Sequence, residues 1–283
     1  MPRPSLFSDA ERVSLLRATQ SEDELARHYT LNESDLALIR QRRGDDNRLG
    51  FAVQLCLLRF PGRGLTAGGI VEDAVVQWIS HQLKVDAVCW PDYFSRSTTR
   101  REHLLELRSY LGLRPFGLKD YRQSRVFLVS TALQTDKALV LADTAVEEWR
   151  RLKVILPPVE VVERLVSEAI TRANRQICAG LADPLSETQR AKLDRWLELK
   201  QGTRITWLSW LRQSPVKPNS RHMLEHIERL KELRTLGLPD GFGHQIHRNR
   251  LLKMAREGGQ MTPQNLGKFE NQRRYATRGG AGH

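Results

Sequence analysis

Basic side chains recur at helical spacing along this chain, and their chemistry suits a polyanion. Arginine presents a planar fork of donors that matches phosphate oxygens and the edge of guanine. Side chains three residues apart share a helix face, so a row of them can follow phosphates or enter a major groove. We predict that the following basic residues contact DNA: Arg40, Arg42, Arg43, Arg48, Arg100, Arg101, Lys119, Arg122 and Arg125.

The overall charge supports this interpretation. The chain carries 45 Lys and Arg against 33 Asp and Glu, a formal charge of +12, and its isoelectric point is near 10.0. Such a balance favours nucleic acid or an acidic membrane surface as partner. A further row, Arg250, Lys253 and Arg256, has the same spacing. For any single row, a solvated basic face is an equally good explanation.

A second pattern with chemical meaning is HMLEH, which runs from His222 to His226. It matches the H-x-x-E-H signature of inverted zinc proteases, with both histidines on one side of a helix. No third ligand stands out, and so short a motif often arises by chance. A zinc hydrolase is therefore only the weaker alternative. Trp207 and Trp210 could stack bases, but tryptophans at helical spacing more often belong to a core.

The spacing of the cysteines and the hydropathy of the chain indicate the cellular compartment. Cys56, Cys89 and Cys178 are scattered without a C-x-x-C spacing, which is typical of a reducing cytoplasm. The first residues lack the apolar core of a signal peptide, and no apolar run is long enough to cross a membrane. We expect a soluble cytoplasmic protein without membrane partners.

The elements that must position the basic residues are helices. Asn32 and Asp35 form a capping-box pattern, and an apolar helix is predicted over about 47–60. Gly112 stands where a left-handed C-terminal cap belongs. The helices predicted on either side of it, 101–111 and 119–134, resemble a helix-turn-helix. No convincing strand alternation occurs, so we predict an all-α, multi-helix fold with helix-turn-helix-like DNA-binding elements.

Pro157 and Pro158 mark the predicted boundary between two helical blocks. We expect residues 1–157 to form an N-terminal helical DNA-binding domain. Residues 158–283 would form a second helical block that adds DNA contacts or carries self-association. After RRYAT the chain ends in a glycine-rich segment, 278–283, through which a helix would not continue.

Several long stretches resemble, in order, the N-terminal region of the Tn-three family of replicative transposases, which are carried on unit transposons. The matching stretches are MPRPSLFSDAER, LARHYTLNESDLALIRQRRGDDNRLGFAVQLCLLRFPG, RREHLLELRSYLGLRPF, EAITRANRQI, TWLSWLRQSPVKPNSRHMLEHIERL and NRLLKMAREGGQMTP. They cover nearly the whole chain.

The resemblance implies a cytoplasmic bacterial protein whose helical domains bind the terminal inverted repeats in double-stranded DNA during transposition. It also implies a distant catalytic domain of ribonuclease-H type, with an Asp-Asp-Glu triad and a divalent metal, magnesium by expectation. That region has no counterpart in this chain, so we expect no catalysis and no cofactor here, and the chain looks truncated. An inert remnant with only non-specific DNA binding is the alternative.

Overall fold

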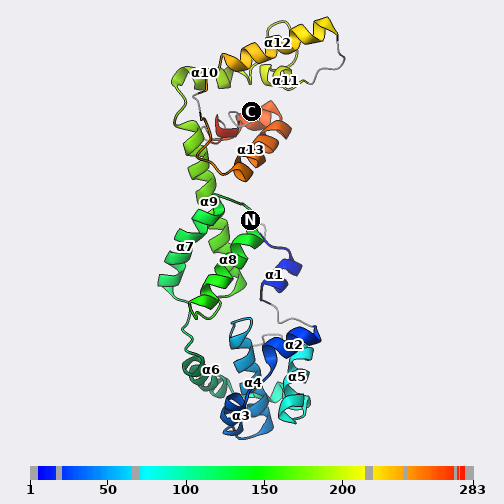
Figure 1. Cartoon of the computed structure of the whole chain (residues 1–283), viewed down its shortest axis with the longest axis vertical. Coiled ribbons are helices and arrows are strands. Elements are labelled where there is room, and N and C mark those ends of the chain that lie inside the picture. The colour runs from blue at the N-terminus through cyan, green and yellow to red at the C-terminus, as the bar shows by residue number, and fades with distance from the viewer. Residues whose placement is uncertain are drawn as a thin grey trace. The chain divides into compact units, whose positions relative to one another are not determined.

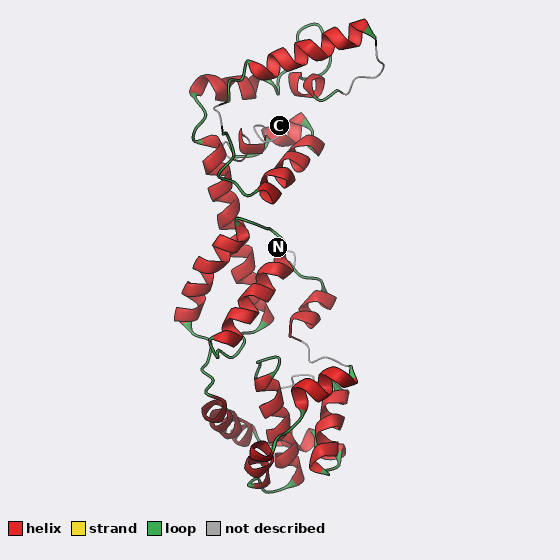
Figure 2. Cartoon of the chain, viewed as in Figure 1, coloured by secondary structure: helices red, strands yellow, loops and turns green. Residues whose placement is uncertain are grey.

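The computed structural model describes residues 6–16, 21–65, 71–213, 219–238, 241–270, 273 and 275–277. The regular structure of these residues is helical, and Figure 2 draws no strand among them. The all-α fold class predicted from the sequence is therefore confirmed. In the described part of the chain, no helix is both long and apolar enough to cross a membrane. The glycine-rich segment 278–283 lies outside the described residues.

The chain divides into two compact units, residues 1–125 with 138–167 and residues 126–137 with 168–283. The division falls inside α7 (Leu118–Ala132) and α9 (Val159–Ala182). The first unit also contains α1 (Asp9–Leu16), α2 (Glu22–Tyr29), α3 (Glu33–Arg40), α4 (Asp45–Arg59), α5 (Asp73–Leu83), the 3₁₀ turns η1 (Ala87–Cys89) and η2 (Pro91–Ser95), α6 (Ser97–Leu111) and α8 (Ala138–Arg151). The second unit contains α10 (Glu187–Arg195), α11 (Trp207–Leu211), α12 (Ser220–Arg234), α13 (Arg248–Gln260) and α14 (Pro263–Gly267).

Helix α4 is the centre of the group formed by α2, α3, α5 and α6 in the first unit (Figure 1). Every residue from Leu49 to Leu58 is buried, because α2, α3, α5, α6 and both 3₁₀ turns pack around it. A helix that is apolar on all sides is stable only inside a core. Helix α4 therefore supports α2, α3, α5 and α6, which pack around it.

A close approach inside this core requires a glycine. At Gly50 an added Cβ would lie 2.2 Å from the ring of Tyr93, so the aromatic ring packs directly on the helix backbone. The Tyr93 hydroxyl accepts a hydrogen bond from Gln54 (2.9 Å) and is paired with His103 Nδ1 at 2.9 Å. Burial lowers the pKa of His103. These contacts join α4, η2 and α6.

Two helix ends follow the local signals in the sequence. The Asn32 side chain accepts from the Asp35 backbone and the Asp35 carboxylate accepts from the Asn32 backbone, so the predicted capping box is confirmed. Gly112 closes α6 with a φ of 64°, the left-handed conformation that the sequence predicts there. Short-range hydrogen bonds thus determine where these elements begin and end.

Candidate nucleic-acid interface

Four of the predicted contacts lie at or beside the loop between α3 and α4: Arg40 ends α3, Arg42 and Arg43 are in the loop, and Arg48 is in α4. Gly44, with a φ of 81°, turns the chain into α4. The Arg42 side chain is half-buried, and its two terminal nitrogens donate to Glu106 on α6 at 2.9 and 2.7 Å. Its guanidinium also lies 4.7 Å from the centre of the Phe51 ring. Arg42 is therefore an anchor that holds the loop against α6.

The neighbours of Arg42 divide into a second anchor and two exposed cations. The Nε of Arg48 donates to the carbonyl of Arg42 at 3.1 Å, and its Nη1 lies 3.4 Å from Asp45. The side chains of Arg40 and Arg43 are exposed, and they make no hydrogen bond or ion pair with the described residues. Among Arg40, Arg42, Arg43 and Arg48, only Arg40 and Arg43 have exposed side chains without a partner in the described part of the chain.

A similar division occurs at the start of α6. Arg100 donates to the carbonyl of Phe94 at 2.7 Å and lies over the Phe94 ring, 5.1 Å from its centre. Arg101 is exposed and has no side-chain partner among the described residues.

The inward and outward faces of helix α7 carry different kinds of side chain. The inward face carries Asp120, which accepts from both terminal nitrogens of Arg114 (2.8 and 2.7 Å) and from the Gly117 backbone (2.9 Å). These hydrogen bonds, that from Arg114 above all, lower the pKa of Asp120. One turn further on, Ser124 accepts from the Trp149 indole at 2.9 Å. The inward face thus holds α7 in place with polar contacts.

The outward face of α7 carries Lys119, Arg122, Gln123 and Val126, all exposed. They follow one another at spacings of three, one and three residues, so they form a single stripe on one continuous helix. No acidic side chain interrupts it. Arg125 is half-buried and lies off this stripe, which therefore differs from the predicted row of Lys119, Arg122 and Arg125. Gln123 and Val126 were not predicted, although the i, i+3, i+4, i+7 period starting from Lys119 contains them.

The connection between α6 and α7 is longer than a helix-turn-helix turn. Residues 112–117 separate the helices, and the Arg114 backbone exchanges hydrogen bonds with Lys153 (3.0 Å) and Ile155 (2.9 Å). Helix α6 packs mainly against α4 and η2. The link between the two helices pairs with the segment after α8, and the predicted resemblance of α6 and α7 to a helix-turn-helix stays a prediction.

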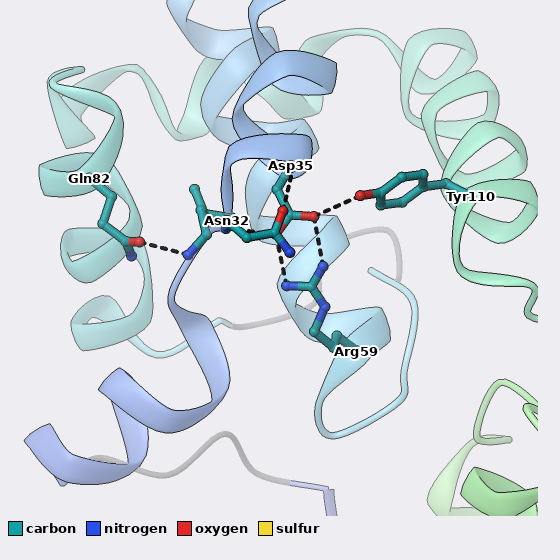
Figure 3. Close-up of polar contacts among 6 residues, drawn as sticks. Asn32, Asp35, Arg59, Gln82 and Tyr110 are labelled. Atoms are coloured by element: carbon teal, nitrogen blue, oxygen red, sulfur yellow. Dashed lines mark hydrogen bonds and ion pairs between the residues drawn. The ribbon is translucent and has the colours of Figure 1, made fainter.

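A buried charge network positions α3, α4 and α6 relative to one another (Figure 3). Asp35 on α3 is fully buried and accepts from both terminal nitrogens of Arg59 on α4, at 3.0 and 2.7 Å. Tyr110 on α6 donates to the same carboxylate at 3.1 Å. Burial alone would raise the pKa of Asp35, but the hydrogen bonds from Arg59, Asn32 and Tyr110 hold it below its usual value.

The row at 250, 253 and 256 is not a continuous basic surface. Arg250 is buried, with an ion pair to Asp136 at 3.0 Å and a hydrogen bond to Asn174. Lys253 pairs with the same carboxylate. Arg256 is exposed. The first two side chains therefore attach α13 to the segment before α8, and the prediction that the row follows phosphates is wrong for them.

The HMLEH segment and the tryptophan pair complete the list of sequence motifs. His222 is half-buried and His226 is exposed on α12, and among the described residues no group of three or more His, Cys, Asp or Glu could hold a metal ion. Trp207 and Trp210 are half-buried and meet edge to face, with ring centres 5.6 Å apart. Lys200 lies over both rings, at 4.9 and 4.3 Å.

Comparison with known proteins assigns the sequence to a protein family. A family model described as "Domain of unknown function (DUF4158)" matches residues 6–169. The chain belongs to the DUF4158 family. This member is 57% identical over 277 residues to the transposase for transposon Tn501 of Pseudomonas aeruginosa. It is 56% and 55% identical to the transposases for Tn3926 and Tn21 of Escherichia coli.

Each of these alignments covers 98% of the chain and 28% of the relative. This DUF4158 chain therefore spans little more than a quarter of the length of the curated relatives that it matches. The resemblance to Tn-three family transposases, inferred from the sequence stretches above, is confirmed.

Proposed function

We propose that this chain binds double-stranded DNA at the terminal inverted repeats of a transposon, as the end-binding part of a Tn-three family transposase. The relatives are named as transposases, and the charge of +12 favours a polyanionic partner. The observation that carries the proposal is the exposed, acid-free stripe of Lys119, Arg122, Gln123 and Val126 on α7.

The stripe has the side-chain chemistry that reads base edges in a major groove. Arginine donates two hydrogen bonds to guanine, glutamine pairs with adenine, and an aliphatic group contacts the thymine methyl. Helix α7 has 15 residues, hence a length of roughly 22 Å, and a major groove about 12 Å wide admits such a helix. By contrast α4 is buried at every position from Leu49 to Leu58 and presents no face to DNA.

Phosphate contacts are assigned to exposed cations on the first unit. Arg40, Arg43 and Arg101 fulfil this condition, since their charges are not neutralised by described residues. Arg42, Arg48 and Arg100 are assigned a supporting role, because their guanidinium groups already contact Glu106, the Arg42 carbonyl and Phe94. Phosphate contacts set the register and orientation on the duplex, while base contacts specify the sequence.

The proposal is tested with the full chain and two labelled duplexes of equal length. One carries the terminal repeat of transposon Tn501, and the other carries the same bases in scrambled order. Arg122→Ala is compared with Arg27→Ala, which removes the same charge from an exposed position on α2. We expect Arg122→Ala to weaken binding to the repeat by about tenfold or more, as loss of a bidentate base contact does, and Arg27→Ala to change it less than threefold. Equal affinity of the wild-type chain for both duplexes would refute the end-binding function.

A further inference from the structure

A cavity of about 510 Å³ opens beside the first turn of α7, and all of its lining residues belong to the first unit. Its walls are mainly apolar and include two aromatic rings, those of Phe116 and Tyr121. Its size lies within the roughly 300–1,000 Å³ of pockets that bind small organic groups. None of the described residues that line it is acidic, and the charged ones are Arg108 and Arg164. The cavity thus combines aromatic and apolar surface with positive charge.

Arg108, on α6, is a half-buried cation without an acceptor in the described part of the chain. The Nε atoms of six described arginines are buried without a hydrogen-bond partner: Arg42, Arg108, Arg190, Arg212, Arg229 and Arg250. In the other five, the terminal nitrogens donate hydrogen bonds elsewhere. Arg108 forms no side-chain hydrogen bond or ion pair with the described residues. A partly desolvated charge of this kind is costly unless an anion from outside the chain pairs with it.

Two exposed side chains in the lining connect the cavity with the surface. Arg164 is exposed, and its guanidinium lies 5.3 Å from the centre of the Tyr121 ring. Leu118 is 65% exposed. It precedes Tyr121 by three residues and Arg122 by four, and residues at these spacings are neighbours on a helix surface. Leu118 therefore lies between the cavity and the outward stripe of α7.

We propose that the cavity receives one nucleotide of the bound duplex, turned out of the base stack beside α7. This inference rests on the proposed binding of α7 to a transposon end. The base lies against Phe116 and Tyr121, as extruded bases stack on aromatic and apolar side chains. Arg108 and Arg164 pair with the phosphates on either side of it. Leu118 enters the gap left in the stack, as apolar side chains do at kinked base steps.

The lining favours a nucleotide of DNA over a small free anion. Inorganic phosphate would pair with the two arginines and leave the aromatic walls uncovered. A nucleotide joins an anionic phosphate to a flat base that stacks on such rings. The stripe that we assign to the duplex begins at Lys119, directly after Leu118, so a duplex bound there lies next to the cavity.

A scan with mismatched duplexes tests the proposal on the full chain. Each base pair of the Tn501 terminal repeat is replaced in turn by a mismatch, and the Kd is measured by fluorescence anisotropy. A mispaired base costs less to extrude, so we expect one position at which the mismatch lowers the Kd about tenfold. An abasic nucleotide at that position should bind more weakly than the mismatch, because no base then fills the cavity. Equal binding of the two would indicate a kinked duplex with an empty cavity and would overturn the proposal.

Filling the cavity tests whether the base enters it. Val161 lines the cavity, and Val161→Phe adds a ring there, so the gain from the mismatch should fall to less than threefold. The matched control is Val140→Phe on α8, at a side chain that is 43% exposed outside the cavity, and it should keep the full gain. Thermal melts of both variants verify that they fold. An equal gain in the two variants would refute entry of the base into this cavity.

Arg108→Met removes the charge and keeps an unbranched apolar side chain. It should weaken binding to the repeat several-fold without lowering the melting temperature, since Arg108 has no described partner to lose. Unchanged binding would exclude Arg108 as a phosphate contact and contradict the proposal.

The wild-type chain separates this proposal from the end-binding function. Equal affinity for the repeat and the scrambled duplex would refute end binding itself. A preference for the repeat with no position at which a mismatch lowers the Kd would refute only the extrusion. In that case, binding of free deoxynucleotide monophosphate, measured by calorimetry, would identify the cavity as a small-molecule site instead.

Discussion

At the scale of single residues, the arginines divide according to what they touch. Arg42 and Arg59 lie in bidentate contacts with Glu106 and Asp35, whereas Arg43 is exposed without a side-chain partner among the described residues. Bidentate pairs that are partly buried contribute to stability, and truncating one partner leaves the other charge uncompensated. Exposed cations contribute little to folding and remain available to an anion.

The buried Asp35 carboxylate should be the most costly of these charges to remove. Asp35→Asn leaves Arg59 facing a neutral amide and should lower the free energy of unfolding by about 3 kcal/mol at pH 7. Urea denaturation followed by circular dichroism measures this loss. The control is Asp45→Asn, at an exposed pair with Arg48, which should cost about 0.5 kcal/mol or less. Equal costs for both substitutions would contradict the role of the buried network.

The same network predicts an acid dependence. The pKa of Asp35 in the folded chain is held below its usual value, so its contribution is fully present above the unfolded pKa of about 3.9. It is lost as the pH falls through the lower, folded-state pKa. The stability difference between the wild type and Asp35→Asn should therefore shrink below pH 4. A difference that stays constant from pH 7 to pH 3 would show that the carboxylate is not stabilised as an anion.

Arg42 and Arg43 provide a paired test of the division between anchors and exposed cations. Arg42→Ala should lower the melting temperature, because it removes the contacts with Glu106 and Phe51. Arg43→Ala should leave the melting temperature unchanged and weaken DNA binding several-fold, through one lost phosphate contact. Thermal melts and fluorescence anisotropy on the two variants measure both quantities, and the reverse assignment of effects would exclude Arg43 as a contact.

At the scale of elements, the Tyr93 ring of η2 packs directly against the backbone of α4 at Gly50. Gly50→Ala would place a methyl group 2.2 Å from the Tyr93 ring, and the ring is held by its bonds to Gln54 and His103. We expect a loss of about 3 kcal/mol, the upper end for overpacking. The control, Gly259→Ala in α13, has nothing within 4 Å of the new methyl and should be neutral or stabilising. A neutral Gly50→Ala, measured by denaturation, would contradict the packing of η2 on α4.

The sequence predicted the elements better than it predicted the roles of the basic residues. Capping at Asn32 and the left-handed end at Gly112 are local effects, and both were predictable. The partner of Arg42 is 64 residues away, and that of Arg250 in α9 is 76 residues away. No local pattern encodes such contacts, so basic residues at helical spacing could not be sorted into anchors and exposed cations. On α7 the helical period counted from Lys119 would have predicted Gln123 and Val126, and not Arg125, as members of the exposed stripe.

At the scale of the whole molecule, the charge of +12 predicts how binding responds to salt. If the five exposed cations Arg40, Arg43, Arg101, Lys119 and Arg122 each neutralise a phosphate, the slope of log K against log salt should be about −4.5. The proposed contacts are all made by side chains, so chelation of divalent metal should leave the affinity unchanged. Titrations at several salt concentrations, with and without EDTA, measure both effects. A flat salt response, or binding that requires magnesium, would contradict this account.

The central claim is that α7 reads the sequence of a transposon end, and Gln123 tests it most directly because it carries no charge. The measurement is the ratio of Kd for a scrambled duplex to Kd for the terminal repeat, for the wild type and for Gln123→Ala. The account predicts a large ratio for the wild type and a ratio about tenfold smaller for Gln123→Ala, with the affinity for the scrambled duplex unchanged. Identical ratios for the two proteins would contradict base reading by this face of α7.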